Sequence, residues 1–255
     1  MKEKQFRYIL GQRVDFTSYH DAKKIILNLS KINKASFICA SNVHMVMESY
    51  DDYNFQNIVN TSNLVTPDGM PLVWALKLLG IKNAVRVYGP KLMMDLLSLY
   101  SKENLPIGLY GGTEKTKNML LKILPQKYKG LKINYSYSPP FRKILDEEKK
   151  EINQKIIESK CKILFVALGC PKQEKWMFEN YKELSIPLIG VGAAFDFIAN
   201  PKNQAPVLMQ KIGLEWFYRL TTEPKRLWYR YLYHNPRFIA LFSKQLLCDR
   251  LFRKV

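Results

Sequence analysis

The chain has 255 residues, of which 47% are hydrophobic, a composition that fits a globular protein with a substantial core. Its 40 lysines and arginines against 22 aspartates and glutamates give a net charge of +18, which indicates an anionic partner: nucleic acid, an anionic membrane surface or a phosphorylated substrate. The four cysteines form no CxxC pair, and no apolar run reaches the ~20 residues of a membrane span, so a disulfide framework and a transmembrane protein are excluded.

The start of the chain, Met1 to Arg7, has no apolar core of a signal peptide. Together with the cysteine usage, this predicts a protein that is made in a reducing cytoplasm and stays on that side of the membrane. Of the cysteines, only Cys170 follows a strand in a loop where a reactive thiol is conceivable, and no histidine accompanies it locally.

Apolar runs alternate with segments of helical periodicity along most of the chain. Strands are predicted at 36–40, 63–66, 106–110, 131–135, 162–168 and 187–191, and helices at 19–33, after residue 42, and at 70–79, 90–101, 114–124, 146–159 and from 172 onward. This alternation predicts an α/β fold: a Rossmann-like parallel sheet with helices on both faces.

Five of these strands end in a polar or glycine-containing loop. The loops lie at Asn42, Asp68, Gly111, Pro171 and Gly192. Because ligands of open α/β sheets bind at the carboxyl ends of the strands, loops that converge on one edge predict a site there.

The segment Val166–Trp176 is the most informative of these loops. Its apolar strand stops at Gly169, Pro171 redirects the backbone, and Lys172 and Gln173 open a helix whose N-terminus suits a phosphate. The same spacing also occurs in ordinary strand-to-helix turns, so both interpretations remain open.

Two carboxylates stand at strand ends. Asp68 in Thr-Pro-Asp-Gly is either a plain turn residue or a general base for an acceptor hydroxyl, and Asp196 either binds a ligand or caps a helix. Arg86, Lys172 and the C-terminal arginines could neutralise a diphosphate.

Other chemistries have no support in the sequence. The three histidines are scattered, no Asp-x-Asp is present, and no metal site is predicted. GxGxxG and GxxxxGK[ST] motifs are absent, and Gly111-Gly112-Thr113 is only a weak phosphate loop.

Residues 205–255 differ from the rest, which divides the chain into an α/β domain (1–204) and a helical appendage (205–255). The appendage holds ten lysines and arginines against three acidic residues, and ten of the 32 aromatic residues. Pro206, Pro224 and Pro236 predict two or three short helices. This composition suits an anionic membrane surface; a helical layer packed on the sheet and nucleic-acid binding are the alternatives.

Four sequence blocks, taken together, resemble the WecG/TagA/CpsF family, glycosyltransferase family 26. The blocks are Thr66–Trp74, Arg86–Pro90, Leu168–Trp176 and Gly190–Asp196, and Leu214–Arg226 in the tail matches as well. The resemblance spans roughly residues 8–235.

The resemblance implies an inverting, metal-independent transfer of a sugar, often N-acetylmannosamine or its uronic acid, from a UDP-sugar to a polyprenyl-diphosphate-linked sugar. Such enzymes need no cofactor and build teichoic acid, enterobacterial common antigen or capsule. The implied place is peripheral, on the inner face of the bacterial cell membrane. A homo-oligomer is possible, and no nucleic-acid partner is expected.

Individual residues inherit expected roles from the resemblance. Asp68 is the expected base. Asn42 and Gln173 are the other expected catalytic residues and line the pocket near the sugars, and Arg86 lies near the acceptor. The expected substrate-binding residues are Arg86, Gly89, Pro90, Gly111, Gly112, Pro171, Lys172, Asp196, Arg219, Arg226 and Arg230, the last three in a membrane-facing appendage. Ala40 stands where the family often has threonine, which bears on the identity of the donor sugar.

Two other function classes remain open at this point. A basic nucleic-acid-binding protein on a Rossmann-like fold would explain the charge of the tail, although not the strand-end carboxylate. A nucleotide-dependent oxidoreductase would need the glycine fingerprint that the sequence lacks.

Overall fold

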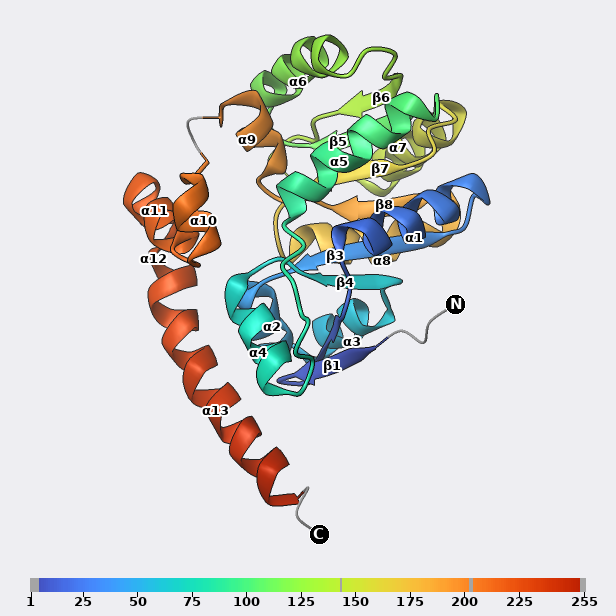
Figure 1. Ribbon diagram of the computed structural model, residues 1–255. Coiled ribbons are helices and arrows are strands. Elements are labelled where there is room, and N and C mark those ends of the chain that lie inside the picture. Colours follow the sequence, from blue (N-terminus) through green and yellow to red (C-terminus); the bar gives the residue numbers. More distant parts are fainter. Residues whose placement is uncertain (1–4, 143, 202–203, 253–255) are drawn as a thin grey trace.

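The computed structural model describes residues 5–142, 144–201 and 204–252, and the fold is built around one parallel sheet. Its six strands have the order β4-β3-β8-β7-β5-β6 (Figure 1). They are β3 (Ser36–Ser41), β4 (Leu64–Pro67), β5 (Ile107–Gly111), β6 (Ile133–Tyr137), β7 (Leu164–Ala167) and β8 (Pro187–Gly190), and every neighbouring pair is parallel. All six predicted strands and the α/β class are confirmed.

Helices cover both faces of the sheet, as predicted. One face packs against α1 (Tyr19–Lys31), α5 (Gly89–Lys102), α6 (Glu114–Lys127) and α9 (Ala194–Ala199), and the other against α3 (Tyr53–Thr61), α7 (Asp146–Glu158) and α8 (Lys172–Leu184). Each face has its own cluster of fully buried apolar side chains, including Phe165 on the first and Phe37 on the second. The two clusters fix the sheet, and therefore the positions of its carboxyl ends.

A small antiparallel hairpin flanks the sheet and was not predicted. It consists of β1 (Phe6–Ile9) and β2 (Gln12–Asp15), joined by Leu10 and Gly11, both at positive φ. The hairpin is fastened to the sheet because Gln12 donates to the Ser41 hydroxyl (2.7 Å) and the Asp15 carboxylate accepts from the Val65 amide (2.7 Å).

A third apolar cluster joins this hairpin to α2 (Val43–Asp51), α4 (Met70–Leu78) and the last helix of the chain. Phe238 and Phe242 of that helix are buried in the cluster. The C-terminal helix is therefore anchored by its aromatic side chains to the same elements that border Asp68.

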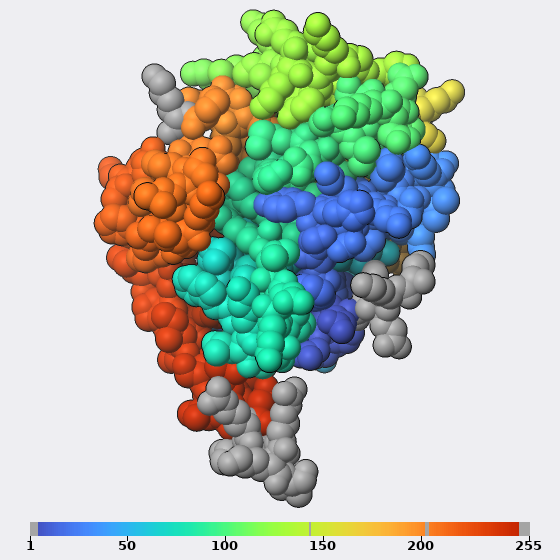
Figure 2. All heavy atoms as spheres, viewed as in Figure 1, coloured from blue at the N-terminus to red at the C-terminus, as the bar shows by residue number. Residues whose placement is uncertain are grey.

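The C-terminal segment comprises α10 (Val207–Lys211), α11 (Glu215–Thr222), α12 (Pro224–Trp228), the π-helical turn η2 (Tyr229–Tyr233) and α13 (His234–Phe252). The last three run on as one helix, so the predicted break at Pro236 is wrong. Pro236 is the third residue of α13, which directly follows the π-helical turn η2, so the helix accommodates the missing N–H by a local change in its hydrogen-bond pattern. Figure 2 shows this segment (orange to red) as a layer along one side of the body.

Within the described ranges, no helix combines the length and the apolarity that crossing a membrane requires. Residues 1–4 and 253–255, which include most of the N-terminal segment judged not to be a signal peptide and the last two basic residues of the tail, lie outside the described residues.

Candidate active site

Two cavities meet at the carboxyl edge of the sheet, where the strand arrowheads in Figure 1 point toward the C-terminal segment. The larger has a volume of about 830 Å³ and lies over the strand ends. The smaller, about 480 Å³, lies between α4 and α13 and has mostly apolar walls. The residues that line both cavities are Asn42, Asp68, Glu215, Arg219 and Arg230.

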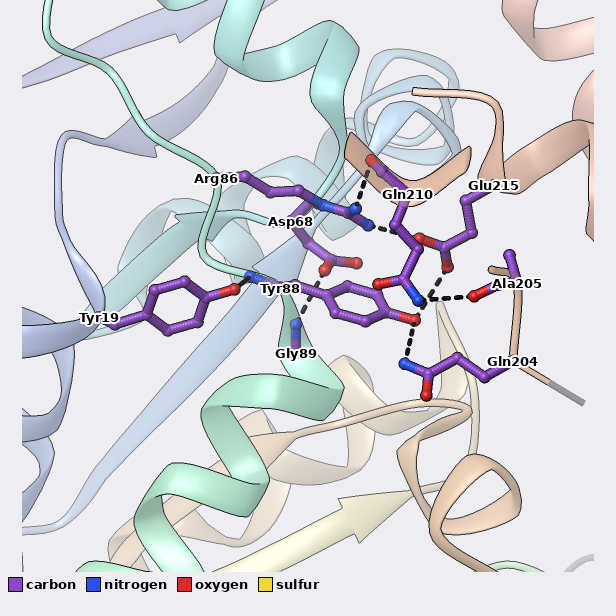
Figure 3. A network of polar contacts seen from close by, with 9 residues as sticks. All are labelled: Tyr19, Asp68, Arg86, Tyr88, Gly89, Gln204, Ala205, Gln210 and Glu215. Carbon is purple, nitrogen blue, oxygen red and sulfur yellow. Dashed lines mark hydrogen bonds and ion pairs between the residues drawn. The ribbon is translucent and has the colours of Figure 1, made fainter. Parts of the chain in front are cut away.

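Asp68 follows the last residue of β4 and is held on two sides by backbone groups. Its amide donates to the Ser41 carbonyl (2.8 Å), and its Oδ1 accepts a hydrogen bond from the amide of Gly89 (2.8 Å), the first residue of α5 (Figure 3). The N-terminal end of a helix thus faces the carboxylate, which favours its ionised form.

Burial by the surrounding protein has a larger effect on the ionisation of Asp68, and it acts in the opposite direction. Burial raises the pKa of its carboxyl to about 6, although the nearby Arg86 guanidinium lowers it. The side chain keeps some exposure where it faces the cavities. A carboxylate with this pKa is ionised at neutral pH and can still accept a proton, as a general base must.

Arg86 connects the sheet edge to the C-terminal segment. Its Nη2 lies 2.7 Å from Oε2 of Glu215, its Nη1 donates to the Gln210 carbonyl (3.2 Å), and its Nε donates to the Asp68 carbonyl (Figure 3). The guanidinium stacks 4.2 Å from the ring centre of Tyr88, whose hydroxyl donates to Oε1 of Glu215 (3.0 Å). Arg86 therefore lies beside Asp68, as expected, but much of its hydrogen-bonding capacity is used by the protein itself.

Asn42 and Gln173, the other two expected catalytic residues, lie on the wall of the larger cavity and both have structural partners. Asn42 caps α2, because its Oδ1 accepts from the Met45 amide (3.3 Å). The Gln173 side chain is buried, accepts from the Gly192 amide (3.2 Å) and donates to Glu174 (2.6 Å). Both residues can therefore present side chains that the protein has already oriented.

The expected substrate-binding residues near the strand ends divide into two groups. Gly89, Pro90, Gly112, Lys172 and Asp196 line the larger cavity. Within the part of the chain that the structure describes, Gly111 and Pro171 do not contribute to its wall.

Gly111 has a backbone role instead. At φ +114°, a Cβ there would lie 2.4 Å from the Ala167 carbonyl oxygen, so only glycine lets β5 and β7 approach at their ends. Asp196 lies in the first turn of α9, where it accepts from the Thr116 hydroxyl (3.1 Å), and it does not cap that helix, because Ala193 occupies the cap position.

The three expected arginines of the C-terminal segment reach the larger cavity. Arg226 is exposed and pairs with Glu223. The Nε atoms of Arg219 and Arg230 are buried and, within the described ranges, have no hydrogen-bond partner. Buried guanidinium N–H donors without a hydrogen-bond partner could be satisfied by an anionic ligand.

Three features of this region escaped the sequence analysis. Glu215 was quoted only as part of a motif, and its role depends on how the C-terminal segment docks. Glu174 is fully buried, which raises the pKa of its carboxyl to about 7. Its spacing of three residues from the apolar Met177, which places both on one face of α8, could have indicated this burial. Finally, His44 and His234 lie together, so the expectation of scattered histidines is wrong for two of the three.

Cys170 does not behave as an activated nucleophile. Burial raises the pKa of its thiol well above the usual value, and the nearby Glu174 carboxylate raises it further. The thiol is therefore held protonated at neutral pH, and the four cysteines are all free, as predicted.

A Rossmann-like sheet with a carboxylate and arginines over its strand ends is an arrangement that suits group transfer from an anionic substrate. The family model "Glycosyl transferase WecG/TagA/CpsF family" matches residues 7–251. The chain belongs to this family and is a glycosyltransferase, as the resemblance of its sequence blocks indicated.

Curated relatives match this chain over most of their length. The chain is 28% identical over 214 residues to an N-acetylglucosaminyldiphosphoundecaprenol N-acetyl-β-D-mannosaminyltransferase of Bacillus spizizenii, covering 83% of this chain and 80% of the relative. Proteins with the same name from Bacillus subtilis (29% identical; 82% and 79% covered) and Staphylococcus aureus (27%; 86% and 85%) also match. Family membership decides against nucleic-acid binding and oxidoreduction as the main function.

Proposed function

We propose that the protein is an inverting, metal-independent glycosyltransferase that moves N-acetylmannosamine or a related hexose from a UDP-sugar to a polyprenyl-diphosphate-linked sugar. The product would enter teichoic acid or another cell-surface polysaccharide. The observation that carries the proposal is the meeting at Asp68 of a larger cavity with mixed polar and apolar walls and a smaller, mostly apolar cavity. Such a pair fits one reaction between a nucleotide sugar and a lipid-linked sugar.

In the proposed reaction, the Asp68 carboxylate takes the proton of the acceptor hydroxyl. The hydroxyl oxygen forms a bond to the anomeric carbon of the donor while the bond from that carbon to the β-phosphate oxygen breaks. UDP leaves with the bonding electrons, and attack from the opposite face inverts the anomeric configuration.

The charge of the UDP leaving group would be met by the C-terminal segment. Arg219 and Arg230 line the cavity with buried Nε atoms that have no partner in the described part of the chain. Donors placed where negative charge develops stabilise a transition state directly. In this proposal the arginines supply the positive charge that a divalent ion provides in other nucleotide-sugar transferases.

The apolar cavity is the proposed place for the first part of the polyprenyl chain. Trp74 and Leu78 of α4 face Phe238, Ile239 and Phe242 of α13 across it. The lipid diphosphate would then lie near the shared wall, with its sugar at Asp68.

The same end of the molecule suits contact with a membrane surface. Apolar side chains that are half or more exposed occur along the C-terminal segment at Val207, Leu208, Ile212, Leu232 and Ile239. Together with the excess of basic residues in 205–255, they fit a peripheral enzyme on an anionic inner leaflet.

The experiment is a UDP-release assay with a panel of UDP-sugars and a short-chain polyprenyl-diphosphate-linked N-acetylglucosamine, with and without added Mg²⁺. We expect acceptor-dependent release with one donor, at the same rate in both buffers. Release that depends on Mg²⁺ would refute the metal-independent mechanism. Absence of acceptor-dependent release with every donor would refute the proposed acceptor.

A further inference from the structure

A compact group of metal-ligating side chains joins α2 to the start of α13. His44 and Glu48 lie four residues apart on α2, a spacing that places both on one face of the helix. His234 is the first residue of α13. The ligand atoms of the three side chains lie within 4.8 Å of one another.

The distances inside this group suit a shared ion better than direct hydrogen bonds. Nδ1 of His44 lies 3.6 Å and Nε2 of His234 lies 3.8 Å from Oε1 of Glu48. Both separations exceed normal hydrogen-bond lengths. Ligands bound tetrahedrally to Zn²⁺ at its usual bond lengths stand ~3.4 Å apart. The two separations from Glu48 are close to this value, and the two imidazoles, whose ligand atoms lie within 4.8 Å of each other, would have to move together on binding.

His44 has a hydrogen bond with the backbone of Cys170, but the ring nitrogens that face Glu48 lack the hydrogen-bond partners that buried polar groups normally have. His234 is 2% exposed, and neither of its ring nitrogens has a hydrogen-bond partner among the described residues. Nδ1 of His44 is buried and unpartnered in the same sense. A buried imidazole without a partner costs free energy, and a metal bond would satisfy it.

Glu48 has no ion pair with an arginine or lysine in the described part of the chain, although the charges of Lys175 and Arg230 act on it. Asp51 pairs with Arg237 and Asp52 pairs with Lys175, whereas the contacts found for Glu48 are those with the two imidazoles.

The backbone at His234 is unusual as well. The π-helical turn η2 immediately precedes it, and such turns are rare and often occur at functional sites. Arg230 within the turn lines both cavities, while His234 after it faces Glu48. The turn thus lies between the active-site side and the α2 side of one continuous helix.

We propose that His44, Glu48 and His234 form a site for a divalent transition metal of the Zn²⁺ type. Two imidazoles and one carboxylate are an established ligand set for this ion, and the fourth position would hold water. His44 also lines the smaller cavity, so the ion would fasten α13 to α2 beside that cavity and would have a structural role there. Its test requires no glycosyltransferase activity.

The experiment measures metal binding by the full-length protein after metals have been removed with a chelator and the chelator dialysed away. Zn²⁺ affinity is measured by competition with a chromophoric chelator, and Co²⁺ is added as a spectroscopic probe. We expect one equivalent of Zn²⁺, a rise in the unfolding temperature on its addition, and the visible absorption of four-coordinate Co²⁺ with nitrogen and oxygen ligands.

Variants identify the ligands. Glu48→Gln and His234→Gln should each weaken Zn²⁺ binding at least tenfold and abolish the rise in unfolding temperature. His20→Gln, which changes the exposed third histidine on α1, should bind like the parent. Circular dichroism without metal checks that each variant is folded.

Three results would overturn the proposal. The first is no Zn²⁺ binding by the folded parent protein. The second is unchanged affinity in both Glu48→Gln and His234→Gln. The third is a thiolate-to-cobalt charge-transfer band, which would place the metal on a cysteine.

Discussion

The two walls of the candidate active site differ in whether their polar side chains have hydrogen-bond partners within the protein. On the sheet wall, Asp68 and Gln173 make hydrogen bonds to backbone amides at fixed positions. On the wall formed by the C-terminal segment, Arg219 and Arg230 have buried Nε atoms with no partner in the described ranges. The polar side chains of the sheet wall are satisfied without a substrate, whereas in the proposed function an anion would satisfy those of the C-terminal wall.

This difference suggests a division of labour. A base must be held within hydrogen-bond distance of the proton that it removes, so it benefits from rigid strand ends. Groups that receive a diphosphate do more for catalysis when they are aimed at charge that develops later in the reaction. Glu215 lies where the two walls are tied together, through Arg86 and Tyr88.

The largest expected effect comes from removing the base on the sheet wall. Asp68→Asn should lower kcat by about 10³-fold, within the range for general-base catalysis, while donor affinity changes little. A single-turnover assay and donor titration measure the two quantities. The exposed Asp146→Asn serves as the matched control, and a variant Asp68→Asn with parental kcat would show that the base lies elsewhere.

The same variant has a predicted effect on stability. The pKa of Asp68 is raised from its ordinary value to about 6, so the folded state binds more protons than the unfolded state between about pH 4 and pH 6. Stability due to this group is therefore present below pH 4 and lost as the pH rises through 6. Asp68→Asn should be at least as stable as the parent in urea unfolding at pH 8; a clear loss of stability would contradict this sign.

The packing of the sheet wall is tested at Gly190. A Cβ there would lie 2.8 Å from Nε2 of Gln173 and 3.0 Å from Cε of Met177, so Gly190→Ala should lower the free energy of unfolding by about 1–3 kcal/mol. Gly69→Ala is the control, since its φ is −87° and its nearest neighbour would lie 3.4 Å away. Equal stability of both variants would show that this wall is not tightly packed.

The pH dependence sharpens the assignment of the base. Asp68 must be ionised to accept a proton, so kcat/KM should fall about tenfold per unit below its pKa of about 6 and level off above it. Asp68→Asn should lose this acidic limb. If the limb persists in the variant, another group titrates.

The smallest expected effect concerns the contact between the walls. Glu215→Gln removes a negative charge that raises the pKa of Asp68 and releases Arg86, which lowers it, so the acidic limb should move to lower pH. Glu223 pairs with the exposed Arg226, so the control variant Glu223→Gln should leave the acidic limb at the same pH. An unchanged profile in Glu215→Gln would mean that the two walls are electrostatically independent.

The central sheet could be predicted because most of its strands are short, largely apolar runs, and five of the six end in a polar or glycine-containing loop. The hairpin β1–β2 could not, since both of its strands mix charged with apolar residues and no apolar run marks them. The continuity of α12, η2 and α13 was also missed. Pro236 predicts the end of a helix, and the sequence carries no sign of the π-helical turn that precedes it.

The candidate site was predictable to the extent that it follows from topology. Parallel strands place their carboxyl ends together, so Asn42, Asp68 and Gly112 were bound to meet. The position of Glu215 depends on docking of the C-terminal segment. The meeting of His44 with His234 also depends on it, because 190 residues separate them in the chain.

The most direct test of the two-wall arrangement is the rate of the Arg219→Ala/Arg230→Ala variant in two assay formats. One uses a short-chain, water-soluble acceptor, the other a long-chain acceptor in anionic vesicles, and Lys225→Ala/Lys244→Ala is the control of equal charge change. We expect at least a tenfold loss in both formats, because the arginines meet the diphosphate itself. A loss confined to vesicles would show that they act only in membrane attachment and would contradict a shared active site.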